Sequence, residues 1–398
     1  MLAAETDFET EAETYNSCND NQIYSQHSQS QYTGLMICRE PSSRAPSSTV
    51  LKWYSQTKEE SMQTSLLMEI VAVAEKAAIA AAAYNGRGDK HAADQVATTA
   101  MREAFNSIDF AGRIVIGEGE RDEAPMLFIG EQVGLAWRLS DGVSSIQPDQ
   151  QFDIAVDPLE GTNLCAYNRA NALTTIAIAP QGTLLYAPDT YMWKLAAGAA
   201  AADSGRLHID NTPLENIRAV ASALNKPIEE VNVCVLDRDR HQELIAAVRS
   251  CGARIRLIDD GDVFGAIATA VPGTGIDLYM GSGGAPEGVL AACGLKAIGG
   301  FFMGRLDFTI DKDGVEKRQR AEVTAGLDLD APLSLDTLVR SNDAAFIACG
   351  VTDGEMLAGV QRDASGSITT NSVLMNAADS SVRFLRTTYR GATGVVTF

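Results

Sequence analysis

One segment of this chain, residues 152–163 with the sequence FDIAVDPLEGTN, constrains both fold and chemistry more than any other. Its apolar first half predicts a short buried strand, and the DP pair should end that strand because proline cannot continue the ladder. The GT pair that follows predicts the start of a helix. The turn between them would bring the carboxylates of Asp157 and Glu160 next to a helix N-terminus.

This combination indicates metal-assisted phosphate chemistry. Carboxylates at the end of a strand bind hard divalent cations, and the free N–H groups of a helix N-terminus bind phosphate. The alternative is a surface turn whose acids are incidental. The remainder of the chain has to decide between the two.

The composition narrows the functional class. A formal net charge of −20 argues against a nucleic-acid-binding protein, and an anionic substrate would need cations held by clustered acids. The seven cysteines show no paired spacing, which favours a reducing compartment over a disulfide framework. The four histidines share no metal-ligand spacing, which argues against zinc. No apolar run reaches the roughly 20 residues of a membrane span. We therefore expect a cytoplasmic protein, with a plastid as the alternative.

The chain divides into three parts by pattern. Residues 1–60 are polar and without apolar periodicity, which predicts a flexible extension, and their acidic beginning argues against an organelle transit peptide. Residues 61–214 predict an α+β half that binds metal and phosphate. Residues 215–398 predict a substrate-binding α/β half whose C-terminal strands close the structure.

Two further stretches of the first half contain acidic residues that are candidates for the same metal and phosphate site. A helix is expected over 64–84, and a second helix ends near Phe105 with Asp94 in its first turn, where a favourable dipole contact is the alternative to a functional role. A strand at 114–116 runs into GEGERDEAP, which has four acids within six positions. Like charges at the edge of a core need a counter-ion, so we favour metal ligation over a solvated acidic loop. A strand at 172–179 should be followed by a hairpin.

The second half alternates strands and helices. Strands are expected at 232–236, 254–258 and 276–280, with helices at 242–250 and 262–271, and this order predicts a parallel sheet. Ligands bind such sheets at the carboxyl ends of the strands. The polar residues at those ends are Arg238, Arg240 and His241, then Asp259, Asp260 and Asp262, then the segment 285–288.

Seven segments, in order along the chain, carry a family resemblance. They are GRGDKHAAD (86–94), IVIGEGERDEAPMLFIGE (114–131), DIAVDPLEGTN (153–163), APDTYM (187–192), LDRDRH (236–241), DDGDV (259–263) and GGAPEG (283–288). Together they resemble the class II fructose-1,6-bisphosphatases, in the dual fructose-1,6-/sedoheptulose-1,7-bisphosphatase form of cyanobacteria. DPLEGT is shared with the wider lithium-sensitive phosphatases, whose usual form has Asp where Glu160 stands. The resemblance implies the layered α/β sugar-phosphatase fold of that superfamily.

The resemblance also implies roles for individual residues. The implied metal ligands, for Mg²⁺ or Mn²⁺, are Asp94, Glu118, Asp157, the carbonyl of Leu159, Glu160 and Glu287. The implied substrate contacts are Gly161, Thr162, Tyr191, Arg238, Arg240, Asp260, Asp262 and Gly284. Glu120 or Asp122 would accept the proton of the attacking water, and Thr162 would orient that water or contact the phosphate. Two departures are Arg238, where Lys is frequent, and Ala93, where Thr is frequent.

The implied activity is metal-dependent hydrolysis of the 1-phosphate of fructose-1,6-bisphosphate, and of sedoheptulose-1,7-bisphosphate, in gluconeogenesis or the Calvin cycle. A dimer or tetramer of identical chains is implied as well, with no nucleic-acid or membrane partner. Two alternatives stay open. One is an inositol-monophosphatase-like enzyme, against which the pair Arg238 and Arg240 argues because a monophosphate requires no distal clamp. The other is an inactive sugar-phosphate-binding regulator.

Overall fold

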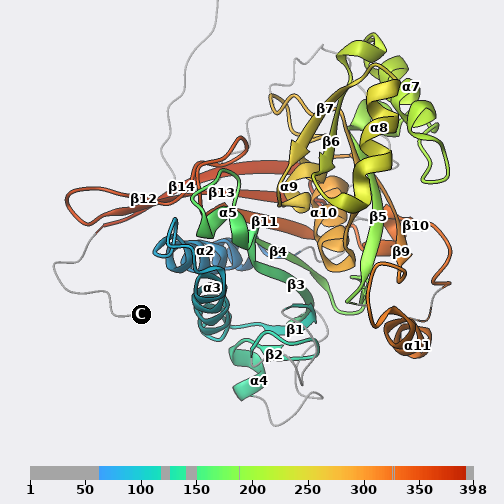
Figure 1. Cartoon of the computed structure of the whole chain (residues 1–398). Helices are drawn as coiled ribbons and strands as arrows, with labels where there is room; N and C mark the ends of the chain where they lie inside the picture. The colour runs from blue at the N-terminus through green and yellow to red at the C-terminus, as the bar shows by residue number, and fades with distance from the viewer. Residues whose placement is uncertain are drawn as a thin grey trace, which may run out of the picture. The chain divides into compact units, whose positions relative to one another are not determined.

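The computed structural model describes residues 62–117, 126–139, 150–187, 189–324, 326 and 328–390 (Figure 1). The extension expected over residues 1–60 lies outside this range, and so do three residues with expected roles, Glu118, Glu120 and Asp122. The described part is a mixed α/β structure with two sheets. No described helix combines the length and apolarity that a membrane span requires.

The first sheet has eight strands in the order β12-β13-β11-β4-β3-β1-β2, and β14 pairs with β13. Its strands are β1 (Ala111–Ile116), β2 (Gln132–Val133), β3 (Gln151–Glu160), β4 (Leu173–Pro180), β11 (Ala345–Gly350), β12 (Gln361–Arg362), β13 (Ile368–Asn376) and β14 (Ser381–Tyr389). The second sheet has six strands in the order β10-β9-β5-β8-β6-β7. Its strands are β5 (Tyr191–Ala197), β6 (Asn232–Leu236), β7 (Arg254–Ile258), β8 (Leu278–Gly284), β9 (Phe301–Asp307) and β10 (Leu333–Ser334).

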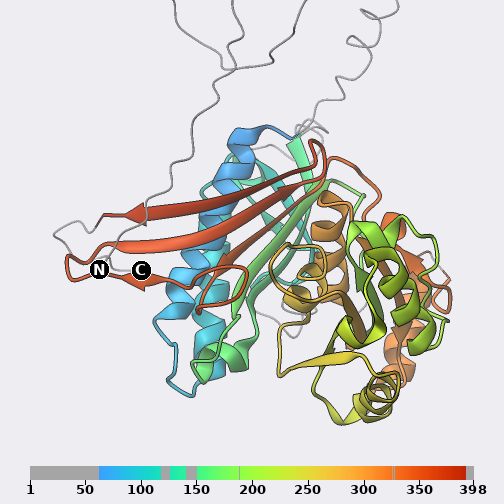
Figure 2. The same ribbon diagram turned by 90° about the horizontal axis from the view of Figure 1, so that it is seen from above.

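Helices cover both faces of both sheets, so the layers follow one another as α, β, α, β, α (Figure 2). The outer layer on the first sheet consists of α2 (Thr64–Ala82) and α3 (Lys90–Phe105), and the middle layer of α9 (Asp262–Ile267) and α10 (Ala285–Ala297). The outer layer on the second sheet consists of α7 (Pro213–Leu224) and α8 (Gln242–Ser250). The shorter or peripheral helices are α4 (Leu135–Leu139), α5 (Thr162–Ala166), α6 (Ala199–Ala202), α11 (Gly314–Thr324) and α12 (Leu335–Leu338), with 3₁₀ turns at Ile228–Glu230 and Asp239–His241.

The central strands of the first sheet are buried on both faces, which explains the uninterrupted apolar run at residues 176–179 of β4. Along β4, Ile176 and Ile178 pack in the core under α2, whereas Ala177 and Ala179 pack in the core under α10. Successive side chains of a strand point to opposite faces, so a strand between two cores cannot alternate with polar residues.

A buried carboxylate ties the C-terminal strand to the first helix. Glu75 of α2 is 2% exposed, and it accepts hydrogen bonds from the hydroxyl groups of Ser372 at 3.2 Å, Thr387 at 2.7 Å and Tyr389 at 2.5 Å. These hydroxyls belong to β13 and β14, the last strands of the described chain. Burial and the adjacent Glu75 carboxylate raise the pKa of the Tyr389 phenol above its usual range, so the phenol stays a donor. We call these four residues the Glu75 cluster.

Most predicted elements are confirmed. The strands at 232–236 and 254–258 and the helix at 242–250 have the predicted bounds, and β6 pairs in parallel with both β7 and β8. The second sheet is mixed, however, because β5 pairs antiparallel with β8 and β9. The helix expected over 262–271 ends at Ile267, and Asp94 lies beyond the first turn of α3, whose N-cap is Asp89.

Two local predictions were wrong. The DP pair does not end β3, which continues to Glu160 through a register shift. The hairpin after β4 is absent from the described chain, because Leu184 instead forms an isolated bridge with Val339. The turn is held by the carboxylate of Asp153, which accepts from the backbone N–H groups of Thr183 and Leu184 at 2.9 and 3.2 Å.

The sheets exchange strands across residue 214, where the sequence suggested a division into halves. β5 precedes that residue and lies in the second sheet, whereas β11 to β14 follow it and lie in the first. The strands β11 to β14 therefore belong to the same sheet as the DPLEGT segment.

Candidate metal and phosphate site

The geometry of the site begins with the register shift in β3. Asp157 pairs with Thr175 of β4 while Glu160 pairs with Leu173, so β3 contains one extra residue between them. Because of such a bulge, the residue that follows it points to the opposite face of the sheet from the one it would occupy in a regular strand. Leu159 accordingly packs in the core under α2, and Glu160 faces the same side as Asp157. Pro158, which has no N–H to donate, occupies the bulge, where a proline is tolerated.

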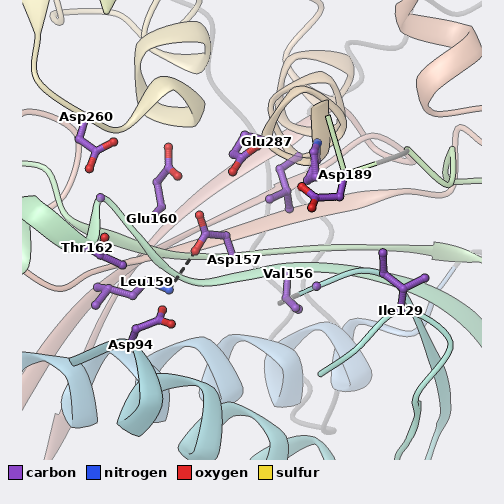
Figure 3. Close-up of a pocket in the computed structure, with 14 residues that line it drawn as sticks. Asp94, Ile129, Val156, Asp157, Leu159, Glu160, Thr162, Asp189, Asp260 and Glu287 are labelled. Carbon is purple, nitrogen blue, oxygen red and sulfur yellow. Dashed lines mark hydrogen bonds between the residues drawn. The ribbon is translucent and has the colours of Figure 1, made fainter. Parts of the chain in front are cut away.

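A third carboxylate reaches the pair from the middle layer. Glu287 lies in the first turn of α10, and oxygens of Asp157, Glu160 and Glu287 lie within 4.8 Å of one another. Figure 3 shows the three side chains converging. Gly284, the N-cap of α10, allows this approach, because a Cβ there would come within 2.0 Å of Glu287 Oε2. We call these three residues the carboxylate cluster.

The cluster opens into a cavity of about 390 Å³. The residues that line it are Asp94, Gly117, Ile129, Val156, Asp157, Leu159, Glu160, Gly161, Thr162, Asp189, Asp260, Pro286, Glu287 and Leu290. Eight residues singled out in the sequence are therefore brought to one place (Figure 3). A cavity of this size suits a small ligand.

The electrostatics of the cluster call for a cation. Burial, and next the Asp157 charge, raises the pKa of Glu160 well above its usual value of 4.5. Burial also raises the pKa of Glu287, with Lys194 opposing the shift and Asp262 adding to it. The Oε2 atom of Glu287 is buried and has no hydrogen-bond partner in the described part of the chain. An orphaned carboxylate oxygen among convergent carboxylates fits a hard, oxygen-preferring divalent cation.

One cation of the protein itself lies beside the cluster and is not among the residues predicted from the sequence. Lys194 of β5 is buried, and its Nζ lies 2.6 Å from Oδ2 of Asp262, which also accepts from the Tyr279 hydroxyl at 3.3 Å. The next residue, Val263, donates its backbone N–H to Glu160 at 2.9 Å. The available signal was a single charged residue inside the apolar strand YMWKLAA. Asp189 at the cavity was also missed.

The eight residues expected to bind substrate divide into three groups: three that line the cavity, two that contact other residues of the site, and Tyr191 with the two arginines. Gly161, Thr162 and Asp260 line the cavity. Asp262 is only 6% exposed and pairs with Lys194, while Gly284 supports Glu287. The helix that Thr162 begins, α5, has five residues, and Gly161 before it has a left-handed φ of 79°.

The basic pair follows β6, at the carboxyl end of that strand. Arg238 Nη2 lies 3.5 Å from Oδ1 of Asp260. The Arg240 guanidinium donates from Nε and Nη2 to the carbonyl of Ser282, at 3.1 and 2.7 Å, and its Cζ lies 4.9 Å from the centre of the Tyr191 ring. Neither arginine lines the cavity, but Arg238 contacts a residue that does.

Comparison with known families gives the site a context. The family model for bacterial fructose-1,6-bisphosphatase, glpX-encoded, matches residues 64–389. The chain belongs to this family. All the site residues described above lie within the matched range.

Relatives with curated names agree with the family. The chain is 45% identical over 338 residues to a protein of Synechocystis sp. named D-fructose 1,6-bisphosphatase class 2/sedoheptulose 1,7-bisphosphatase, and the match covers 82% of this chain and 97% of the relative. Proteins of the same name from Gloeobacter violaceus and Microcystis aeruginosa are 43% and 44% identical. These matches also cover 82% of this chain, and 96% and 97% of the two relatives.

Proposed function

We propose that this chain hydrolyses the 1-phosphate ester of fructose-1,6-bisphosphate and of sedoheptulose-1,7-bisphosphate, in gluconeogenesis or the Calvin cycle. The carboxylate cluster is the observation that carries the proposal, since Asp157, Glu160 and Glu287 converge at a cavity of suitable size. Family membership and the printed names of the relatives support the choice of sugar bisphosphates.

The metal assignment extends the cluster to six ligands. We assign Asp94, Glu118, Asp157, the Leu159 carbonyl, Glu160 and Glu287 to two or more Mg²⁺ or Mn²⁺ ions. When bound, such ions polarise the phosphoryl oxygens and lower the pKa of a coordinated water. The carboxylates hold and orient these ions, and the cavity wall around Thr162 orients the phosphate. Glu120 or Asp122 accepts the proton of the attacking water.

The second half supplies recognition of the remainder of the substrate. Arg238 and Arg240 bind the distal phosphate, as charge-assisted hydrogen bonds from a guanidinium fork favour. Asp260 accepts hydrogen bonds from sugar hydroxyls at the cavity, and Tyr191 supports Arg240 through its ring. Asp262 contributes indirectly, through its ion pair with the buried Lys194, and Gly284 leaves space for the side chain of Glu287. In this proposal residues 61–214 carry most of the metal and phosphate contacts and residues 215–398 most of the contacts to the remainder of the substrate, while Glu287 and Tyr191 each act across that division.

Phosphate release from the full chain tests the proposal. With Mg²⁺ or Mn²⁺ present, fructose-1,6-bisphosphate and sedoheptulose-1,7-bisphosphate should be hydrolysed, and a chelator should abolish the reaction. Inositol-1-phosphate is the control substrate, and its preferential hydrolysis would favour the inositol-monophosphatase alternative. Release from none of the three would favour a binding regulator. Glu118→Gln with near-normal turnover at saturating Mg²⁺ would contradict the metal assignment.

Three coarser properties accompany this function. The αβαβα layering supports assignment to the lithium-sensitive phosphatase superfamily. We assign the protein to the cytoplasm, with a plastid as the alternative, and expect it to form a dimer or tetramer. Sedimentation of the full chain checks the last point.

A further inference from the structure

His241 is a buried histidine that takes no part in the metal and substrate contacts described above. It is 0% exposed and ends the 3₁₀ turn after β6. Its Nδ1 lies 2.8 Å from the carbonyl of Leu236, and its Nε2 accepts from the backbone N–H of Ser282 at 2.7 Å. Because a backbone N–H can only donate, Nε2 is the acceptor and Nδ1 carries the proton. The imidazole is therefore neutral, with both nitrogens engaged.

The imidazole replaces a missing strand contact. Within the described residues β6 pairs with β8 at Val233–Leu278 and Cys234–Tyr279 and no further. Ser282 lies beyond these pairs in β8, and a buried backbone N–H without a partner is costly. His241 supplies the acceptor for that N–H. Gly281 lets the ring come close, since a Cβ there would lie 3.2 Å from the imidazole Cε1.

The same Ser282 anchors Arg240. Its carbonyl accepts from both Nε and Nη2 of the guanidinium, which fixes the plane of the group over Tyr191. The side chain of Arg240 is otherwise exposed, so without this anchor its several rotatable bonds would let the fork turn. One serine thus connects a buried histidine to an exposed arginine.

We propose that His241 is a positioning residue for substrate binding: it holds Ser282 so that the Ser282 carbonyl presents the Arg240 guanidinium, with its Nη1 end directed to the distal phosphate. This inference rests on the proposed role of Arg240. Burial, reinforced by Arg240 and Arg238, lowers the pKa of His241, while Leu236 and Asp262 oppose the shift. The neutral form that the geometry requires is therefore the stable one near neutral pH.

Two variants separate the two hydrogen bonds of the ring. The amide of His241→Asn reaches as far as Nδ1, so it keeps the Leu236 contact and loses Ser282. The amide of His241→Gln reaches as far as Nε2, so it keeps the Ser282 contact and loses Leu236. The two variants therefore have the same polar group at the same buried position, and they differ in whether the contact with Ser282 is kept.

Steady-state kinetics with fructose-1,6-bisphosphate and saturating Mg²⁺ test the inference, at a temperature where circular dichroism shows all variants folded. KM should rise several-fold in His241→Asn, and at most about tenfold because no more than the free energy of the lost Ser282 hydrogen bond can be transmitted to Arg240, with kcat close to that of the unaltered chain. KM in His241→Gln should stay near the unaltered value. An equal rise in both variants, or a loss of kcat without a rise in KM, would overturn the inference.

A cycle with Arg240 distinguishes the inference from the proposed function. Arg240→Ala should raise KM, and adding His241→Asn should raise it no further, because the histidine acts through the arginine. An additive second rise would refute action through Arg240. Unchanged KM in Arg240→Ala alone would refute the distal-phosphate role itself. A raised KM there, with unaltered KM in His241→Asn, would refute only the role of His241.

Discussion

Replacing Lys194 by methionine should destabilise the protein far more than loss of an ordinary ion pair. Lys194 and Asp262 are 1% and 6% exposed and lie 2.6 Å apart, so the pair is shielded from solvent. Removing one partner of such a pair leaves a buried charge and costs about 3–5 kcal/mol. For a folded part of this size that corresponds to a fall in melting temperature of roughly 5–8 °C.

Thermal melts monitored by circular dichroism provide the measurement, and the chain offers a matched control. Lys226 lies 2.7 Å from Asp277, but its side chain is 39% exposed. Lys226→Met should therefore cost no more than about 1 kcal/mol. The double variant Lys194→Met with Asp262→Asn should recover most of the lost stability, because neither charge then remains buried.

Two results would refute this reasoning. The first is Lys194→Met melting at the same temperature as Lys226→Met, which would mean that the buried charge of Asp262 is compensated elsewhere. The second is a double variant as unstable as Lys194→Met, which would mean that lost packing rather than charge determines the cost.

Three further predictions concern the carboxylate cluster and the Glu75 cluster. Since the pKa values of Glu160 and Glu287 are raised, the metal-free folded state binds more protons than the unfolded state above the usual glutamate range. Their contribution to stability is thus present below the unfolded pKa and lost as pH rises. In chelator, the melting temperature of the unaltered chain should therefore fall between about pH 5 and 8, and it should fall less in Glu160→Gln. Glu287→Gln should lower kcat at least about 100-fold in phosphate release without lowering the melting temperature; unchanged kcat would contradict its ligand role. Tyr389→Phe should lower the free energy of unfolding in urea by about 1.5–3 kcal/mol because it removes a hydrogen bond to Glu75, whereas Thr388→Val on the exposed face should change it little.

Local patterns predicted much of the fold. Two strands and one helix of the second half, at 232–236, 254–258 and 242–250, were placed to the residue, because short apolar runs separated by polar turns are a property of adjacent residues. The same logic failed where pairing is non-local. The bridge from Leu184 to Val339 and the position of β5 in the second sheet depend on chain that returns much later.

The sequence indicated which residues form much of the site, but it did not indicate how those residues are arranged in space. The sequence indicated Asp157 and Glu160, yet their common orientation comes from a bulge that depends on pairing with β4. Lys194 and Asp262 are 68 positions apart, and nothing in either local pattern indicates the other. The same holds for His241 and Ser282, whose contact depends on where β6 stops pairing with β8.

The carboxylate cluster also has a topological consequence. Asp157 and Glu160 belong to a strand of the first sheet, whereas Glu287 lies in the first turn of the helix that follows a strand of the second. A cation bound by all three would be a reversible cross-link, closing a loop of chain that contains four of the six strands of the second sheet. Cross-links that close long loops restrict the unfolded chain most. The ion that serves the reaction would then also stabilise the packing of the two sheets against each other, and the stability of that packing would depend on the metal concentration.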